Sequence, residues 1–307
     1  MNKLVAYALM ASLCAGCMST TSKGAGAQRK QLIMVSHHFV ERRGDHTFKR
    51  LVKQDNPDVY QAQEQRLVNI MNQLIPYADE YVEKDEKIDW AIHEWNAKKI
   101  DTKALGNGAI LISSQFTQNK DLTDADLAFL IAQDMAHIIR HHPQEYYSWK
   151  YFVSPVLFAS SFLTSGVASI AASASQDLYG IGFKHSAEKE ADLLGLEIYA
   201  KAGFDPENAV HLVEKIEPLF KHDHPFKAKI PALLRSQPSF KAKQKYMEAY
   251  QTHVRQMYEK HVDKTSKDLI EWDFKQNANP PDELLKAETA KTSENEKVQA
   301  PKDPLTR

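Results

Sequence analysis

The sequence predicts an α+β fold that is mainly helical and contains a small β-sheet. The clearest helix signal begins at Thr123, an N-cap residue with Asp126 three positions later, and continues as an apolar run to Ile139. Two short β-prone runs, 90–92 and 109–112, indicate strands, and the second follows a Gly-Asn-Gly turn. Helical patterns outnumber these runs, so we expect a small sheet within a helical domain.

Other segments have helical features. Residues 61–75 carry apolar side chains at helical spacing, and an amphipathic pattern, interpreted as a packing helix, runs from about 240 to 269. A further helix is expected to open at Ser186 and to end at Gly203. Asp205, an N-cap residue followed by proline, predicts that the next helix starts at once.

Composition divides the chain into four parts. Residues 1–17 are predicted to be a lipoprotein signal peptide, and 18–31, rich in small and polar residues, a flexible tether. Residues 32–274 are predicted to form the folded domain, and 275–307, rich in Pro, Lys and Glu, a disordered tail. The net charge of -1 gives no electrostatic case for a nucleic-acid partner.

The amino terminus has the pattern of a targeting segment. Lys3 precedes an apolar run, 4–13, that is too short to span a bilayer, and two small residues stand directly before Cys17. This resembles the bacterial lipobox, which implies that Cys17 is lipidated and becomes the new amino terminus. Cys14 stands where such a signal usually has leucine, and an ordinary signal peptide cleaved nearby is the alternative.

Cysteine usage and the residue after Cys17 bear on the compartment. Cys14 and Cys17 are the only two cysteines, so a chain that begins at a lipidated Cys17 has no free thiol and no disulfide. Cysteine catalysis and cysteine metal sites are thereby excluded. Met18, in place of aspartate, favours the periplasmic face of the outer membrane by resemblance to bacterial lipoproteins.

Residues 151–176 carry no charge. The segment is long enough to span a membrane, but seven serines, a threonine and Pro155 make it a poor span. A packed helical hairpin is therefore favoured over a membrane-dipping element and over a true span.

Polar residues interrupt the helix that begins at Thr123. Gln133 and Asp134 stand in its apolar run, and His137 follows Gln133 by one turn on the same face. This is the geometry of H-E-x-x-H, in which two histidines bind zinc and the glutamate polarises water. A lone buried histidine is more often a core residue than a metal ligand.

Pro143 is expected to end the helix, with His141 and His142 in its last turn. A shifted metal site that uses His141 is the less favoured alternative.

A second pair of polar residues lies downstream. Glu188 and Asp192 are four residues apart and share one face of the helix that opens at Ser186. They could also be exposed acids, because Lys189 and Glu190 stand between them.

Together these segments resemble the metallopeptidases related to the CAAX prenyl endopeptidase, a gluzincin family that includes bacterial heat-shock membrane proteases and periplasmic outer-membrane quality-control proteases. The resemblance extends from about residue 29 to 235. It rests on the zinc helix at 127–142, the E-x-x-A-D helix at 188–196, the G-[YF]-D-P motif within 202–206, the start of the domain at 29–36, and His224-Pro225.

The resemblance implies a zincin-like fold with one zinc ion. The ligand positions are Gln133, His137 and Glu188, with His224 as an additional candidate ligand. Asp192 takes the position of the acid that supports a ligating histidine through its ring nitrogen.

Two positions depart from the family pattern. Gln133 replaces a histidine, and an amide oxygen is a poor zinc ligand. Asp134 replaces the catalytic glutamate, and a base displaced by about 1 Å can lose on the order of 100-fold in rate. Without a histidine at 133, we expect Asp192 to lose its partner and to bond Gln133.

The favoured hypothesis is therefore a pseudoenzyme in protein quality control. It would be a lipoprotein that binds unfolded or assembling envelope proteins in the former substrate cleft, with the Gly108–Ser113 strand pairing with extended peptides. The alternative is an active zinc metalloendopeptidase that degrades misfolded envelope proteins. A third hypothesis is an inert structural lipoprotein.

Overall fold

The computed structural model describes residues 17–19, 23–25, 29–52, 57–97, 99–153, 185–223 and 239–278. The chain divides into two compact units at residue 259, and each is considered by itself. The elements are β1 (Cys17–Ser19), β2 (Lys30–Leu32), α2 (His37–Val52), α3 (Pro57–Ala78), η1 (Asp79–Tyr81), β3 (Ala91–Trp95), β4 (Thr102–Ala104), β5 (Ala109–Ser113), α4 (Ser114–Thr117), α5 (Asp124–Ile139), α6 (His142–Ser148), η2 (Trp149–Val153), a helix over 185–201, α9 (Pro206–Asp223) and α11 (Phe240–Ala278).

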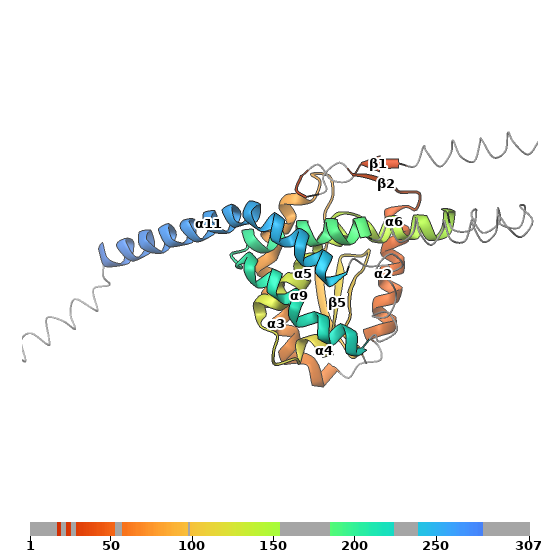
Figure 1. The fold of residues 1–307 in the computed structure, drawn as a ribbon, viewed down its shortest axis with the longest axis horizontal. Coiled ribbons are helices and arrows are strands. Elements are labelled where there is room, and N and C mark those ends of the chain that lie inside the picture. The colour runs from red at the N-terminus through yellow and green to blue at the C-terminus, as the bar shows by residue number, and fades with distance from the viewer. Residues whose placement is uncertain are drawn as a thin grey trace, which may run out of the picture. The chain divides into compact units, whose positions relative to one another are not determined.

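The predicted fold class, mainly helical with a small sheet, is confirmed (Figure 1). Both predicted β-prone runs lie in or beside strands of a three-stranded sheet ordered β3-β5-β4. Strand β5 pairs in parallel with β3 and antiparallel with β4. The prediction that the Gly108–Ser113 strand accepts a peptide is wrong, because β5 is the central strand and already has a neighbour on each side.

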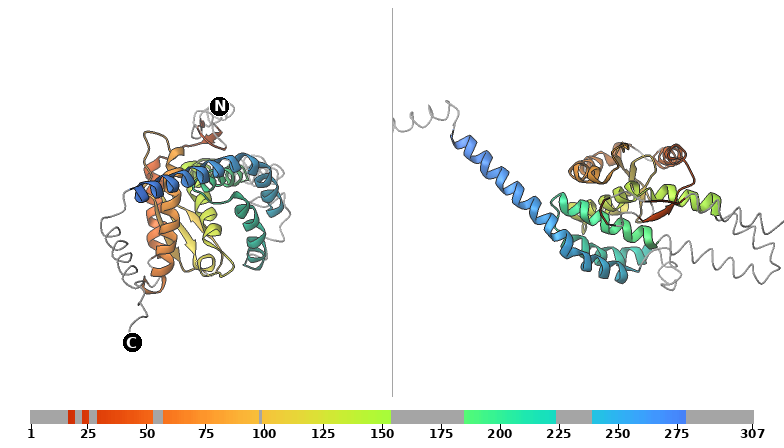
Figure 2. Two further views of the ribbon diagram at one scale, coloured as in Figure 1. Left: turned by 90° about the vertical axis from the view of Figure 1, so that its left-hand side faces the viewer. Right: turned by 90° about the horizontal axis from the view of Figure 1, so that it is seen from above.

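Side chains of β5 alternate between two apolar clusters, as the period of a strand requires. Ile110 and Ile112 belong to the main core with residues of α3 and α5, whereas Leu111 packs in a smaller cluster with residues of α2. Helix α2 therefore covers one face of the sheet, and α3 and α5 cover the other (Figures 1 and 2).

Helix α5 lies in the core and begins as predicted. The hydroxyl of Thr123 accepts a hydrogen bond from the backbone N–H of Asp126, whose carboxylate accepts one from the backbone of Thr123. From Asp126 to Arg140 every residue is buried except Gln133 and His137, which are half-buried. The two positions therefore share the one open face of the helix.

Helix α5 ends earlier than its sequence predicts. Its last residue is Ile139, and His141 adopts a left-handed conformation with φ 52°, which breaks a right-handed helix. His142 then begins α6, with Pro143 in the first turn, where the fixed φ of proline is accommodated. The prediction that His141 and His142 occupy the last turn of α5 is wrong.

Parts of the segment assigned to a tether, 18–31, make defined contacts. Strand β1 pairs antiparallel with β2, so that Cys17 lies opposite Leu32. The buried guanidinium of Arg140 donates hydrogen bonds to the carbonyl oxygens of Lys23 and Ala25, at 2.7 and 2.6 Å. These bonds satisfy a charged group that would otherwise be costly to bury.

The helix over 185–201 is followed by Gly203, with φ 87°, and α9 begins at Pro206, both as predicted. Helix α11 continues to Ala278, four residues into the segment assigned to the tail. None of the described helices combines the length and the hydrophobicity that a transmembrane span requires. Residues 154–184 lie outside the described part, so the three alternatives for 151–176 stay predictions.

Candidate functional site

Helix α5 and the helix over 185–201 approach closely at Gly195. A Cβ atom at this position would lie 2.9 Å from the Cα and the backbone nitrogen of Gln133. Any side chain larger than hydrogen would therefore separate the two helices. Their contact brings the open face of α5, with Gln133 and His137, next to Glu188 and Asp192.

His137 faces Glu188. The Nε2 atom of His137 lies 3.9 Å from Oε1 of Glu188, and the two side chains are 15% and 24% exposed. Burial lowers the pKa of His137 to about 4, so the ring is neutral at neutral pH. The structure thus brings together two of the residues at predicted ligand positions.

The ring of His137 is oriented by His142, which sequence analysis missed. Their Nδ1 atoms are 2.9 Å apart, and Nε2 of His142 lies 3.2 Å from Oε2 of Glu190. Burial, followed by the influence of His137, lowers the pKa of His142 well below its ordinary value. With a proton on Nε2 to meet the Glu190 carboxylate, His142 accepts at Nδ1. His137 then donates from Nδ1, which leaves the Nε2 lone pair directed to Glu188.

Glu190 is buried and lies at the centre of a group of charged side chains. Its carboxylate lies 2.5 Å from Nε of Arg29 and 3.2 Å from Nε of Arg140. Arg29 also pairs with Glu145 at 2.7 Å. The cluster fixes the orientation of His142 and so, indirectly, that of His137.

Asp192 is buried, with 1% exposure, and its partners come from α11. Nζ of Lys243 lies 2.7 Å from Oδ1 of Asp192, and the hydroxyl of Tyr246 donates to Oδ2. The Lys243 ammonium also lies 3.4 Å from Oε1 of Gln133. The expected Asp192–Gln133 bond is therefore replaced by a bridge through Lys243. The sequence of this helix predicts only a packing role.

Asp134 lies against the sheet. Its side chain is 5% exposed, and its buried Oδ2 atom has no hydrogen-bond partner among the described residues. Burial raises the pKa of Asp134 to about 8, and the influence of Thr102 in β4 acts in the opposite direction. At neutral pH and without a bound metal, the Asp134 carboxyl group is therefore protonated in most molecules. A protonated carboxyl group cannot act as a general base.

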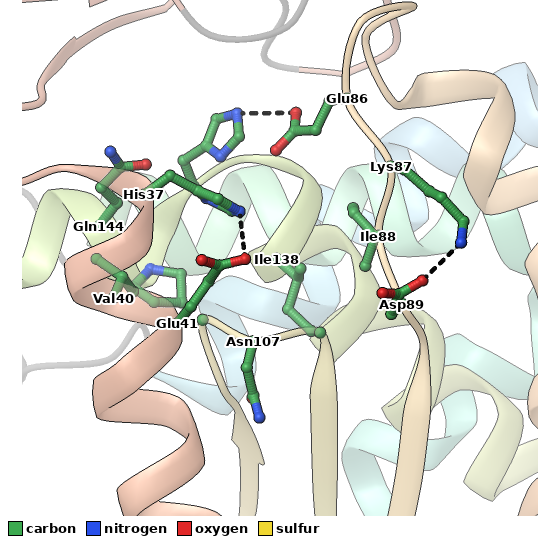
Figure 3. A pocket seen from close by; sticks show the side chains of 14 residues that line it. His37, Val40, Glu41, Glu86, Lys87, Ile88, Asp89, Asn107, Ile138 and Gln144 are labelled. Atoms are coloured by element: carbon green, nitrogen blue, oxygen red, sulfur yellow. Dashed lines mark ion pairs between the residues drawn. The ribbon is translucent and has the colours of Figure 1, made fainter.

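His141 belongs to a different pocket. Figure 3 shows this pocket between α2, the segment around Lys87 and the turn at Asn107. Nε2 of His141 lies 3.5 Å from Oε2 of Glu86 in this pocket, whose lining does not include His137. A shifted metal site that joins His141 to His137 is not formed.

A catalytic zinc site needs three protein ligands and an open position. Among the described residues, no group of three or more His, Cys, Asp or Glu side chains is arranged to hold a metal ion. His137 and Glu188 supply two donors, and His224 lies outside the described residues. Gln133, at the remaining position, contacts a lysine ammonium. The described residues therefore do not fit a catalytic zinc site.

The sequence was compared with curated proteins and with family profiles. A search of curated proteins found no match. The family profile described as "Peptidase family M48" matches residues 61–253, which is more than half of the chain and includes α5, the helix over 185–201 and the first part of α11. Peptidases of this family are zinc-dependent. The chain therefore belongs to peptidase family M48.

Proposed function

We propose that this chain is a catalytically impaired member of its family, a lipoprotein of the bacterial envelope that binds unfolded or assembling envelope proteins without cleaving them. The proposed loss of catalysis is supported mainly by one observation. The Lys243 ammonium contacts both Gln133, at the first ligand position, and Asp192, the acid that supports that position in the family. A side-chain cation therefore joins two groups that would serve a metal in an active relative.

The charge of Lys243 opposes metal binding. Two unit charges about 4 Å apart interact by roughly 4 kcal/mol near a protein surface, and a dication doubles that repulsion. Gln133 offers a neutral amide oxygen that does not compensate for it. The ion pair with Asp192 also occupies the carboxylate that would orient a ligating histidine.

Client binding is proposed for strand β4, which forms an edge of the sheet beside α5. Backbone hydrogen bonds join Leu105 to Ala109 and Ser113 to Asp101. Because paired groups alternate in an antiparallel ladder, the backbone groups of Thr102 and Ala104 are directed away from β5. An extended client segment could add to this edge as a further strand.

The proposed location follows from Cys17. Lipidation at Cys17 would attach the protein to the periplasmic face of the outer membrane.

Replacing Cys17 by serine is expected to abolish acylation and to move the protein out of the outer-membrane fraction. Intact-mass measurement and membrane fractionation check this prediction, with Cys14→Ser as the matched control. An unchanged mass and location in Cys17→Ser would rule out the lipobox interpretation.

A second function, an active zinc metalloendopeptidase acting on misfolded envelope proteins, is favoured by a different observation. The Nε2 lone pair of His137 faces Glu188 in an arrangement suited to a cation. His224 could complete such a site with these two residues. Both functions share the fold and differ in metal content and turnover.

The two functions are distinguished with the purified wild-type protein. We expect substoichiometric zinc by elemental analysis and no cleavage of an unfolded protein substrate above the rate measured with a chelator. Binding of the same substrate should persist in chelator, because β4 pairing needs no metal. Chelator-sensitive turnover that is abolished by Asp134→Ala would overturn the proposal and establish the second function.

A further inference from the structure

Three of the four exposed large hydrophobic side chains in the described residues lie close together in the sequence. Tyr146, Tyr151 and Phe152 are 39%, 40% and 40% exposed, and the fourth, Val262, lies in the second unit. The three belong to the end of α6 and to η2. Clustered exposed aromatic side chains mark an interaction surface more often than isolated ones do.

Neighbouring aromatic side chains order this surface. The ring of Phe39, from α2, lies edge-on to Tyr147 and Tyr151, with centroids 5.9 and 5.7 Å apart. Tyr147 and Tyr151 are stacked, with an interplanar angle of 9°. The aromatic rings are therefore held in fixed positions by one another.

Two exposed cations lie within the same surface. Arg43 donates a hydrogen bond of 2.9 Å to the hydroxyl of Tyr151, and its guanidinium lies 5.5 Å from the ring centroid of Phe39. Nζ of Lys150 lies 5.8 Å from the rings of Tyr146 and Tyr151. We call these six residues, Phe39, Arg43, Tyr146, Lys150, Tyr151 and Phe152, the aromatic–basic patch.

This composition fits the interface of an anionic phospholipid bilayer. Tyrosine has an apolar ring and a polar hydroxyl, and it is enriched at the level of the headgroups. Lysine and arginine are attracted to anionic lipid surfaces. The patch offers both chemistries side by side.

Two features of the chain support a membrane as the partner of the patch. Directly after Phe152 the chain continues through 154–176 without a charged residue. On the other side, Cys17 pairs with Leu32, and the backbone N–H groups of Met34 and Val35 donate to the hydroxyl of Ser148, at 2.8 and 3.1 Å. The proposed lipid attachment point is thus joined through β2 to α6 (Figure 1), and α6 includes Tyr146 of the patch.

We propose that the aromatic–basic patch docks on the surface of an anionic phospholipid bilayer and serves as a second attachment beside the lipidated amino terminus. The inference rests on the envelope-lipoprotein part of the proposed function. A single lipid anchor gives only marginal membrane attachment, whereas a second attachment at the patch would hold one face of the domain against the bilayer. The partner of this surface is therefore the lipid headgroup layer.

The test uses the full chain with Cys14→Ser and Cys17→Ser, so that no acyl chain is present and no other cysteine remains. A single cysteine is introduced as Tyr146→Cys or Phe152→Cys and labelled with an environment-sensitive fluorophore. With vesicles of phosphatidylethanolamine and phosphatidylglycerol, both labels are expected to shift to shorter wavelength. The matched control, Val262→Cys, has the same exposure as Phe152 and should keep its spectrum.

Vesicle sedimentation tests the cations. Arg43→Glu with Lys150→Glu is expected to reduce partitioning onto these vesicles by about tenfold or more. Lys241→Glu, an exposed lysine outside the patch, is the control and should change it little. Unshifted patch labels, an equal shift at Val262, or unchanged partitioning of the double variant would overturn the proposal. Acylation of Cys17 is measured separately by mass, so failure of the docking surface and failure of the lipid anchor are distinguishable.

Discussion

Replacing Lys243 by methionine is expected to lower the free energy of unfolding by about 3 kcal/mol, because the change leaves a buried carboxylate without its cation. Asp192 is 1% exposed, and Lys243 is its partner at 2.7 Å. Methionine keeps the unbranched shape and the apolar part of the side chain, so the loss reports mainly on the charge. The midpoint of urea unfolding measures the effect.

Two variants make this result specific. Lys241→Met changes an exposed lysine of the same helix and should alter stability by less than about 0.5 kcal/mol. Adding Asp192→Asn to Lys243→Met should recover part of the loss, since the asparagine needs no counter-ion. A cost for Lys243→Met no larger than that for Lys241→Met would show that the bridge contributes nothing to stability.

The sequence predicted the part of the site that depends on local spacing. A four-residue separation on a helix places Gln133 with His137 and Glu188 with Asp192, whatever the rest of the fold does. The capping box at Thr123 likewise depends only on neighbours in the sequence. These features could be read from one segment at a time.

What the sequence did not predict depends on contacts between distant segments or on one unusual dihedral angle. Lys243 is 110 residues from Gln133, and an ordinary amphipathic pattern gave no reason to single it out. The left-handed conformation of His141 turns the chain so that His142 returns to His137. A continuous helix would have directed His142, five residues on, to another face.

The sheet also contains a feature that the sequence did not predict. Strand β4 consists of Thr102, Lys103 and Ala104, of which only threonine is enriched in strands, and three residues are too few to show an alternating pattern, so the strand was not predicted. Its pairing with β5 makes β5 the central strand and leaves β4 at an edge of the sheet. The edge was therefore assigned to the wrong strand because its neighbour was too short to recognise.

Restoring a zinc site is expected to require three changes, not two. Gln133→His adds the missing imidazole beside His137 and Glu188, and Asp134→Glu restores the reach of the base. Lys243→Met removes the cation that contacts Gln133 and Asp192, so that Asp192 can accept a hydrogen bond from the imidazole introduced at 133. The triple variant should bind one zinc per chain and cleave an unfolded protein, with the base alone contributing on the order of 100-fold in rate.

The comparison between the double and the triple variant decides whether Lys243 keeps the metal out. Gln133→His with Asp134→Glu alone should bind zinc more weakly, because the ammonium still repels a dication and still occupies Asp192. In the triple background, Glu188→Gln should remove both zinc and turnover, since it replaces a carboxylate donor with an amide. Equal zinc affinity in the double and triple variants would mean that the proposed loss of zinc rests on the ligand replacement at 133 alone. The Lys243 bridge would then be a consequence of that loss, because a buried Asp192 without its histidine still requires a cation.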